Sequence, residues 1–309
     1  MAEAPNPSAF HEGDRVQLTD QKGRKHTVTL VVGKTFFTSK GAILHDDLLG
    51  RPEGIIVSSN KGAPYLAQRP LLQDFVLSMP RGATPVYPKD SAVIVGLADI
   101  YPGAHVVEAG VGSAALTCSL LRAVGESGSV TSFERRADFA EIARGNVDTF
   151  FGHTPSTWSL HVGDLAAVEQ LLPAAQASAD RVVLDMVAPW ECVPAAAWLL
   201  RPGGVLCAYV ASTTQMSRLV ELLRVDGRWI EPEAMELLMR TWHVEGLAVR
   251  PSHRMVGHTG FLVFTRRLAP GTVLPVRRTR PAKGAYGADY SAPGATDTPT
   301  STDPDVSAT

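Results

Sequence analysis

The apolar positions divide the chain into two regions of different periodicity. Between Phe10 and about residue 78, short runs of Val, Ile, Phe and Thr are separated by glycines, as in RVQLTD, KHTVTLVVG, KTFFTSKGAI and GIIVSS. Short strands at near-regular spacing predict a small β barrel or sandwich. The run PLLQDFVLSM that follows predicts a helix leading out of this module.

From residue 105 the pattern alternates between apolar runs and amphipathic stretches. The predicted strands are HVVEA, SVTSFE, TWSLHVGD, RVVLDM and GGVLCAYVA, with helices such as ADFAEIARGNVDTFF and TQMSRLVELLRVDG between them. This alternation predicts a parallel sheet in an α/β fold. Two later runs, RTWHVEGLAVR and HTGFLVFTRR, are expected to pair with each other as a C-terminal antiparallel hairpin.

A proline-rich segment, ATPVYPKDSAVIVGLADIYPG, precedes the first of these strands. Its prolines hold Tyr87 on an extended loop, and Asp90 is expected to cap a helix that begins at Ser91 and ends at Pro102 and Gly103. An aromatic residue in such a loop usually packs, so the sequence pattern leaves a functional role of Tyr87 open.

The most informative stretch is HVVEAGVGSAALT, residues 105–117. The apolar run reaches Glu108, and Gly110 and Gly112 then permit a tight turn close to a ligand. Ser113 is expected to cap the next helix, whose first N–H groups would point at that ligand. The stretch predicts a cofactor site.

Two cofactor classes are compatible with this turn. The spacing Gly-x-Gly-x-x-Ala from Gly110 to Ala115, with Glu134 after the next strand, is that of a dinucleotide site and would indicate a nicotinamide oxidoreductase. Glu108 favours the other class, because a carboxylate suits the ammonium group of S-adenosylmethionine better than a pyrophosphate. The pattern E-x-G-x-G-S resembles the first motif of class I S-adenosylmethionine-dependent methyltransferases.

Four acidic residues lie at the C-terminal ends of successive predicted strands: Glu108, Glu134, Asp164 and Asp185. The carboxyl ends of parallel strands form the rim where open α/β sheets bind ligands. We assign Glu134 to the two ribose hydroxyls, because one carboxylate accepts two hydrogen bonds, and Asp164 to the amino group of the adenine. Asp185 is left for the substrate.

Composition, charge and cysteine spacing limit the possible domain organisation and cellular compartment. The 309-residue chain is 45% hydrophobic with a net charge of −2, which allows one large and one small domain. Its three cysteines lack metal-ligand spacing and are expected to be buried reduced thiols, as suits a cytoplasmic protein. The spacing of the histidines (His243, His253, His258) suits neither a zinc site nor a catalytic triad, and we expect no signal peptide or membrane span.

We expect a flexible tail at residues 1–9, a β domain at 10–78, a methyltransferase domain at 79–270 and a disordered tail at 271–309. Two groups of basic residues are either solvated faces or contacts for a nucleic-acid backbone. The first group is Lys22, Arg24, Lys25, Lys34 and Lys40, and the second is Arg266, Arg267, Arg277, Arg278, Arg280 and Lys283.

The combination of VYPKD, EAGVGS, strand-end FE and GD, LDMVAPW and WHVEG…HRMVGHTGFLVF resembles the bacterial and archaeal tRNA (adenine-58-N1) methyltransferases. The resemblance spans residues 10–270. It implies a class I Rossmann-like methyltransferase sheet behind an N-terminal β module, S-adenosyl-L-methionine as cofactor, a homotetramer, and methylation of adenine N1 in the tRNA T-loop. The chain departs from the family at Ala114 and Ala115, where relatives commonly carry a glycine after the serine.

The candidate catalytic residues are Asp185, expected to accept a hydrogen bond from the adenine amine, and Tyr87, which by resemblance borders the flipped base. The candidate cofactor residues are Glu108, Gly110, Gly112, Ser113, Ala114, Ala115, Leu116, Glu134, Phe139, Gly163, Asp164 and Asp185. No metal is expected. Two alternatives remain: a methyltransferase for protein carboxylates or small molecules, and a catalytically silent RNA-binding subunit. The position of Asp185 at the end of a strand argues against the catalytically silent subunit.

Overall fold

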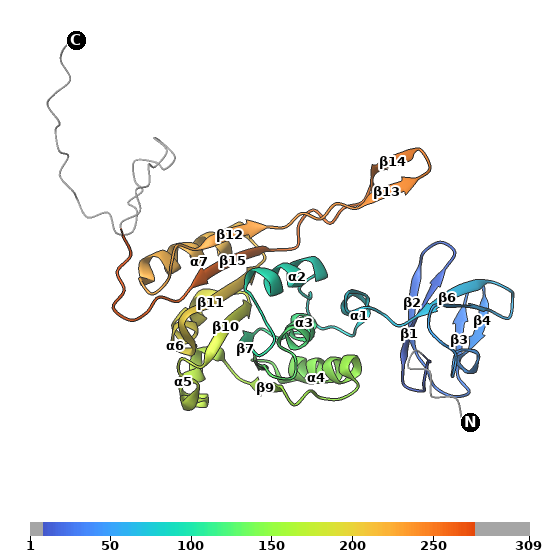
Figure 1. Ribbon diagram of the computed structural model, residues 1–309, viewed down its shortest axis with the longest axis horizontal. Helices are drawn as coiled ribbons and strands as arrows, with labels where there is room; N and C mark the ends of the chain where they lie inside the picture. Colours follow the sequence, from blue (N-terminus) through green and yellow to red (C-terminus); the bar gives the residue numbers. More distant parts are fainter. Residues whose placement is uncertain (1–8, 276–309) are drawn as a thin grey trace, which may run out of the picture. The chain divides into compact units, whose positions relative to one another are not determined.

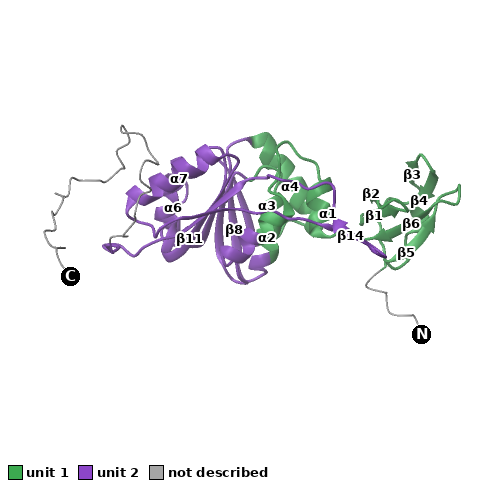
Figure 2. Cartoon of the chain, turned by 90° about the horizontal axis from the view of Figure 1, so that it is seen from above, with its two compact units in different colours: residues 1–92, 111–122, 137–156 green, residues 93–110, 123–136, 157–309 purple. Residues whose placement is uncertain are grey.

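The computed structural model describes residues 9–275, in two compact units that interleave along the sequence (Figure 2). The first unit comprises Met1–Ala92, Val111–Arg122 and Ala137–Ser156, and the second comprises Val93–Gly110, Ala123–Arg136 and Thr157–Thr309. Within residues 9–275, no helix combines the length and apolar character that crossing a membrane requires.

The first unit contains the predicted N-terminal β module (Figure 1). A four-stranded antiparallel sheet has the order β2-β1-β6-β5, and β3 and β4 form a separate hairpin. The strands are β1 (Arg15–Asp20), β2 (Lys25–Thr29), β3 (Thr35–Thr38), β4 (Gly41–Leu44), β5 (Ile55–Ser58) and β6 (Pro64–Gln68), with a short helix η1 (His45–Asp47) after β4. Their inward side chains, including Phe10, Leu18 and Tyr65, form one buried core.

Two details of this module differ from the sequence pattern. The run KTFFTSKGAI folds as two strands, because Gly41 has a φ of +111° that a continuous strand does not use. Strand β6 was not predicted, since its sequence PYLAQ is short and begins with proline.

One helix, which runs from the first unit into the second, differs clearly from the expectation. Helix α2 (Pro88–Leu97) begins three residues earlier than expected and ends before Pro102 and Gly103, so Asp90 lies in the first turn instead of capping. Proline at the first helical position explains the early start, because its fixed φ and missing N–H suit that site. The other α-helices that lie wholly or mostly in the first unit are α1 (Leu72–Ser78), α3 (Ala115–Val124) and α4 (Ala137–Phe151).

The second unit contains a seven-stranded sheet of order β12-β15-β11-β10-β7-β8-β9. The strands are β7 (His105–Ala109), β8 (Ser129–Glu134), β9 (Trp158–Val162), β10 (Ala179–Asp185), β11 (Leu200–Val210), β12 (Glu233–Glu236) and β15 (Phe261–Arg266). Neighbouring strands from β11 to β9 are parallel, and β15 runs antiparallel between β11 and β12. The predicted α/β class is confirmed.

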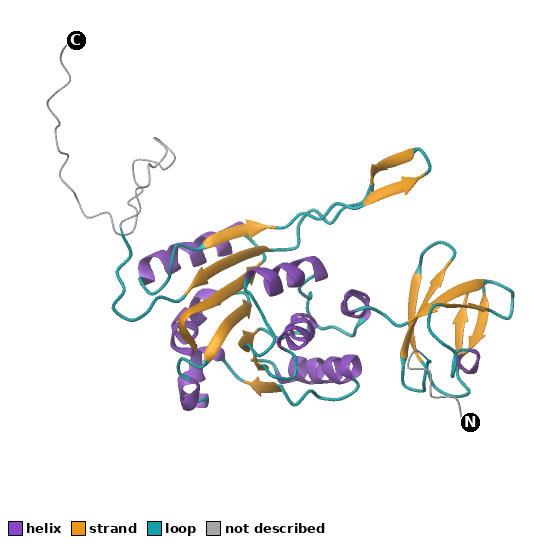
Figure 3. Cartoon of the chain, viewed as in Figure 1, coloured by secondary structure: helices purple, strands orange, loops and turns teal. Residues whose placement is uncertain are grey.

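The predicted pairing of the last two apolar runs is wrong. Strands β13 (Trp242–Glu245) and β14 (Ala248–Pro251) both lie within the first run and pair with each other. The second run becomes β15, whose apolar positions are buried between β11 and β12. Residues 237–260 thus leave the sheet between β12 and β15 and carry the β13–β14 hairpin; we call this segment the arm (Figures 1 and 3).

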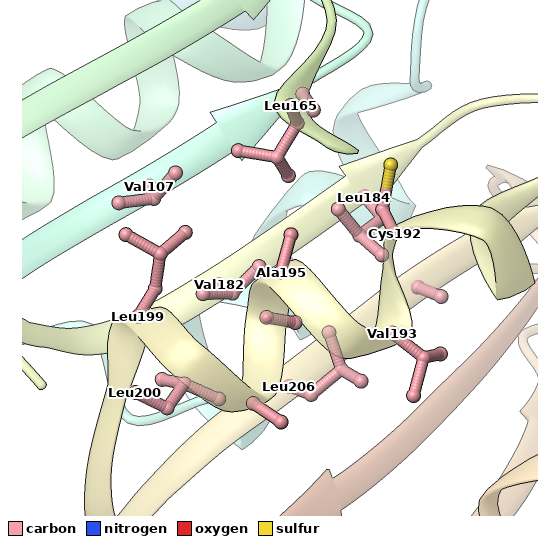
Figure 4. Packing of buried hydrophobic residues seen from close by; sticks show 14 of the residues in the cluster. Val107, Leu165, Val182, Leu184, Cys192, Val193, Ala195, Leu199, Leu200 and Leu206 are labelled. Carbon is pink, nitrogen blue, oxygen red and sulfur yellow. The ribbon is translucent and has the colours of Figure 1, made fainter. Parts of the chain in front are cut away.

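The core of the second unit forms where helix α6 (Val193–Leu199) packs on the sheet (Figure 4). Alanines along α6 let aliphatic residues such as Val182, Leu184 and Leu206 approach closely. The remaining helical segments of this unit are η2 (Leu165–Ala167), α5 (Val168–Leu171), η3 (Pro173–Ala175), η4 (Pro189–Cys192) and α7 (Thr213–Asp226).

The expected tails fall largely outside the described residues, which exclude 1–8 and 276–309. Ala9, assigned to the first tail, is instead buried and forms a β-bridge with Pro52. Of the second basic group, the described Arg266 and Arg267 donate to the backbone carbonyls of Gly203 and Ala197. These two arginines therefore link the end of β15 to β11 and α6.

Candidate active site

The four acidic residues lie at the carboxyl ends of four adjacent strands of the second unit. Glu108 is in β7, Glu134 ends β8, Asp164 follows β9 and Asp185 ends β10. Glu108 and Glu134 are buried, and Asp185 is only partly exposed. Carboxylates in this position form a negatively charged rim at the ligand-binding edge of the sheet.

Glu108 is held by a hydrogen-bond chain that the sequence analysis missed. Ser132 Oγ donates to Glu108 Oε2 at 2.9 Å, and Trp158 Nε1 donates to the same Ser132 oxygen at 3.0 Å. All three side chains are buried, so the chain fixes the orientation of the carboxylate. Alternation along SVTSFE could have indicated that Ser132 faces the core, but its partner belongs to the neighbouring strand.

Burial raises the pKa of the Asp185 carboxyl to about 7, and Coulomb repulsion from Glu108 and then Glu134 adds to this increase. The three carboxyl groups lie at the ends of the adjacent strands β10, β7 and β8, so their charges act on one part of the rim. Their charges would be relieved by a bound cation. A carboxyl group with this pKa is present in both protonation states near neutral pH.

Asp164 takes part in a second network on the same rim. Its Oδ1 accepts from Ala166 N at 2.9 Å, and its Oδ2 pairs with Arg135 at 2.8 Å. The same guanidinium approaches Glu191 at 3.5 Å. Arg135 therefore links the ends of β8 and β9 to η4 and orients Asp164, whose remaining lone pairs stay available to a ligand.

The ends of β8 and β9 are also joined through the backbone. Gly163 N donates to the Glu134 carbonyl at 2.8 Å, while Glu134 Oε1 accepts from Arg136 N at 3.1 Å. On the other side of the rim, Arg218 stacks 4.0 Å from the ring centroid of Trp190, the half-buried aromatic residue that follows Asp185. This contact orients the indole.

Gly110 is required by packing against the protein itself. It has a φ of +86°, and an added Cβ would lie 1.8 Å from the backbone oxygen of Asp185. Gly112 also has a positive φ, of +55°, but an added Cβ would find more room, with its nearest neighbour at 3.9 Å. The two glycines therefore have different roles: close packing at Gly110 and backbone conformation at Gly112.

The expected helix cap at Ser113 is wrong. Helix α3 begins at Ala115, and the carbonyl of Ala114 accepts its first hydrogen bond, from Cys118 N at 3.0 Å. Ala114 therefore occupies the cap position, with a left-handed φ of +63°. The Ser113 hydroxyl is buried and has no hydrogen-bond partner among residues 9–275.

The first unit orders the segments that carry the remaining candidates. Asn146 Nδ2 donates to the carbonyls of Pro80 and Ser113 at 2.8 and 3.0 Å, which joins α4 to the proline-rich segment and the glycine turn. Phe139 packs against Gly82 so tightly that a Cβ there would lie 2.4 Å from the ring. Sequence spacing gave no signal for Asn146, because its partners are backbone atoms far along the chain.

Tyr87 is half-buried, and its carbonyl accepts from Asp90 N and Ser91 N at the start of α2. It belongs to the first unit and Asp185 to the second, so their joint action stays a prediction. Ala115 and Leu116 begin α3 and are buried.

The histidines and cysteines have other surroundings. His258 contacts the Glu236 carboxylate at 2.7 Å and the Ala211 carbonyl at 3.0 Å, where the arm rejoins the sheet. Cys118, Cys192 and Cys207 are buried free thiols, and burial raises the pKa of Cys192 to about 11. Residues 9–275 contain no group of three or more His, Cys, Asp or Glu side chains arranged to hold a metal.

The rim fits S-adenosyl-L-methionine on the chemistry of its side chains. The Asp185 carboxyl group, which Glu108 and Glu134 both repel, suits a ligand with a sulfonium and an ammonium charge, and these carboxyl groups form no metal cluster within the described chain. In the first unit, the buried Ser113 hydroxyl, which has no hydrogen-bond partner among the described residues, is a polar group that a ligand could satisfy. The sheet order, with one antiparallel strand inserted beside the last parallel one, together with this rim, defines a class I methyltransferase.

Comparison with known proteins gives the family. A family model described as "tRNA methyltransferase complex GCD14 subunit" matches residues 66–249, and one described as "TrmI-like N-terminal" matches residues 9–57. The chain belongs to this tRNA methyltransferase family, which uses S-adenosyl-L-methionine as methyl donor.

Individual relatives cover most of the chain. A Thermus thermophilus protein named tRNA (adenine(58)-N(1))-methyltransferase TrmI is 38% identical over 250 residues, which are 81% of this chain and 95% of the relative. A Methanocaldococcus jannaschii protein named for adenine 57 and adenine 58 is 30% identical over 81% of this chain and 93% of its own length. A crystal structure described as a Thermotoga maritima SAM-dependent O-methyltransferase superposes with a TM-score of 0.79, at 28% identity, over 88% of this chain and 97% of that one.

Proposed function

We propose that this chain transfers the methyl group of S-adenosyl-L-methionine to ring N1 of adenine 58 in the T-loop of tRNA. The observation that carries the proposal is the 38% identity to the Thermus relative named for that reaction, across 95% of its length. The carboxylate rim supports it, because the acids expected to hold the cofactor and the substrate lie on four adjacent strands.

Different residues of the rim bind different parts of the cofactor. Glu134 binds the ribose hydroxyls, and Asp164 accepts from the adenine amino group while Arg135 holds it in place. Glu108, oriented by Ser132, binds the ammonium end directly or through water. The remaining cofactor residues line the glycine turn and its surroundings: Gly110, Gly112, Ser113, Ala114, Ala115, Leu116, Phe139 and Gly163.

The bound cofactor supplies an electrophilic methyl group. Adenine N1 carries a lone pair, so the chain has no proton to remove before transfer, and its contribution is alignment, which can lower a barrier by roughly 7–11 kcal/mol. The ionised Asp185 carboxylate accepts a hydrogen bond from the exocyclic amine and stabilises the positive charge that methylation creates. Tyr87 borders the base, which must be flipped out of folded tRNA.

We also propose that the protein assembles as a homotetramer through its arm. Trp242, Val244, Leu247 and Val249 of the β13–β14 hairpin are all more than half exposed. Clustered exposed apolar residues mark interaction surfaces, and a second copy of the chain is the occupant we infer. Light scattering after size-exclusion chromatography tests this: Trp242→Ser with Val244→Ser would dissociate the assembly, whereas an unchanged mass would exclude the arm.

The domain boundaries and the cellular compartment are proposed as well. We place an N-terminal domain at residues 10–78 and a methyltransferase domain at 79–270, in a cytoplasmic protein whose thiols are reduced and buried.

The decisive experiment is methyl transfer from labelled S-adenosyl-L-methionine into two tRNA transcripts that differ only at position 58. The proposal predicts label in the transcript with adenine and none in the one with guanine. Equal labelling of both would disprove the assignment to position 58. Transcripts that vary position 57 determine whether the chain shares the two-site activity named for the Methanocaldococcus relative.

A further inference from the structure

The outer face of the β3–β4 hairpin in the N-terminal module is apolar and exposed. Phe37 pairs with Ala42 and Thr35 pairs with Leu44, so these four side chains share one face. Phe37 is 77% exposed and Leu44 is 50% exposed, whereas Phe36 on the opposite face packs against the module core. Packing within the module therefore does not account for an aromatic residue at position 37.

Two lysines lie at the turn end of this hairpin. The turn at residues 38–41 is joined to the turn at 59–62, since Ser59 Oγ donates to the Lys40 carbonyl at 2.7 Å and Asn60 N donates to the Ala42 carbonyl at 2.8 Å. A Cβ on Gly41 would lie 3.2 Å from Lys61 Cβ, which places Lys61 beside the residue that follows Lys40. The two turns contain no acidic residue.

The lysines at these turns differ from other cations of the module. Arg24 pairs with Asp20 at 2.7 Å and Lys25 pairs with Asp74 at 2.7 Å, so both charges are neutralised locally. Within residues 9–275, neither Lys40 nor Lys61 forms an ion pair through its side chain. The first basic group thus divides into two cations that are paired within the module, Arg24 and Lys25, and three that form no ion pair among the described residues, Lys22, Lys34 and Lys40.

We propose that Phe37, Lys40 and Lys61 form a second tRNA contact, in which an unpaired base stacks on Phe37 and the lysines bind the adjoining phosphates. Aromatic faces accept any base by stacking, and ammonium groups complement the backbone charge. An exposed aromatic ring on the hairpin, with two lysines that form no ion pair at its turn end, favours a nucleic acid over an apolar protein surface, which would leave both charges without partners. This inference rests on the proposed function for the identity of the RNA.

Steady-state methylation of a tRNA transcript by the full-length protein tests the contact. Phe37→Ala raises KM for the transcript about tenfold, with kcat and the Kd for S-adenosyl-L-methionine unchanged. The matched control is Ile56→Ala, which removes an exposed side chain of the module that is aliphatic and offers no ring for stacking. An unchanged KM in Phe37→Ala, or an equal rise in both variants, overturns the proposal.

The salt dependence of tRNA binding tests the role of the two lysines. Lys40→Gln with Lys61→Gln reduces the slope of log Kd for tRNA against log salt by about 1.4, at roughly 0.7 per phosphate contact of a single strand. Lys22→Gln with Lys34→Gln changes the net charge equally and serves as the control. Equal slopes for the two double variants would attribute the effect to overall charge and contradict the site.

A third measurement does not depend on catalysis. Phe37→Trp preserves stacking, and its added fluorescence, measured against the wild-type background, is quenched on titration with tRNA. Quenching without methylation would support the contact while the assigned reaction failed. Absence of quenching with an active enzyme would overturn the contact alone, and loss of self-association in Phe37→Ala would reassign the face to a protein interface.

Discussion

The backbone of Gly110 lies directly against the carbonyl of Asp185, so that a Cβ at position 110 would sit 1.8 Å from that oxygen. The glycine that turns the chain after β7 is thereby packed on the residue that ends β10. A change at either position is transmitted to the other, because backbone atoms at this contact cannot rotate away.

Gly110→Ala is expected to lower the melting temperature and abolish measurable cofactor binding. Both the φ of +86° and the contact with Asp185 oppose a side chain there. Gly145→Ala is the control, since Gly145 lies within α4 with nothing within 4 Å of its added Cβ. The control should be stabilised by about 0.5–1 kcal/mol, and similar effects of both changes in thermal unfolding would contradict the packing argument.

Asp185→Ala is expected to reduce kcat on the order of 100-fold or more while S-adenosyl-L-methionine still binds, because the lost interaction is made to the substrate. Turnover on tRNA and calorimetric titration of the cofactor measure the two effects. Glu169→Gln in α5 removes an exposed carboxylate of the same unit and should change neither. Near-normal turnover in Asp185→Ala would remove this residue from catalysis.

The raised pKa of Asp185 predicts a pH dependence of activity. Since the ionised carboxylate is the active form, kcat/KM should rise with pH and level off above about 7, the pKa of this carboxyl group. Asp185→Asn should lose that rise along with most of its activity. A wild-type profile that is flat from pH 5.5 to 8.5 would show that ionisation of Asp185 is not required.

The same pKa predicts a stability effect of defined sign. The folded-state pKa of about 7 exceeds the ordinary aspartate pKa of 3.8, so between these values the folded protein retains a proton that the unfolded chain has lost, and stability falls as pH rises through this range. Asp185→Asn should therefore gain stability relative to wild type between pH 4 and 8, by at most about 4 kcal/mol. Thermal unfolding at several pH values provides this comparison. A stability difference between wild type and Asp185→Asn that stays constant with pH would exclude the coupling of stability to ionisation of Asp185.

Ala114 is expected to be a strained position that glycine would relieve. A left-handed φ costs a residue with a Cβ roughly 1–2 kcal/mol, and loss of one buried methyl group costs about 0.8 kcal/mol. Ala114→Gly should thus be neutral or stabilising by up to about 1 kcal/mol in denaturant unfolding. Ala115→Gly, at the first residue of α3, should be destabilising, and the opposite order of the two variants would disprove the strain.

Ser132 is expected to act on the cofactor through Glu108. Ser132→Ala leaves Trp158 Nε1 and Glu108 Oε2 without this bridging hydroxyl, at a cost of about 1–3 kcal/mol. We expect the Kd for S-adenosyl-L-methionine to rise about tenfold, with Ser132→Thr restoring it because the hydroxyl is kept. Failure of the threonine variant to restore binding while the protein stays folded would indicate a packing role only.

The sequence by itself determined the α/β class, the glycine turn and the row of strand-end acids. These features depend on local periodicity, on the freedom of glycine and on the common rim of parallel strands, all of which can be read along the chain. The order of alternating elements also placed Glu108, Glu134, Asp164 and Asp185 at the carboxyl ends of the correct strands.

Only the tertiary structure decided which distant segments meet. It inserted β15 between β11 and β12 and left the β13–β14 hairpin on the arm, since burial of a strand on both edges depends on its neighbours. In the folded chain Ala114, and not Ser113, occupies the cap position of α3. Hydrogen bonds join Ser132 to Glu108 and Asn146 to the carbonyl of Ser113. Hydrogen bonds and close packing between residues far apart in sequence leave no periodic signal, because each depends on the position of both partners in space.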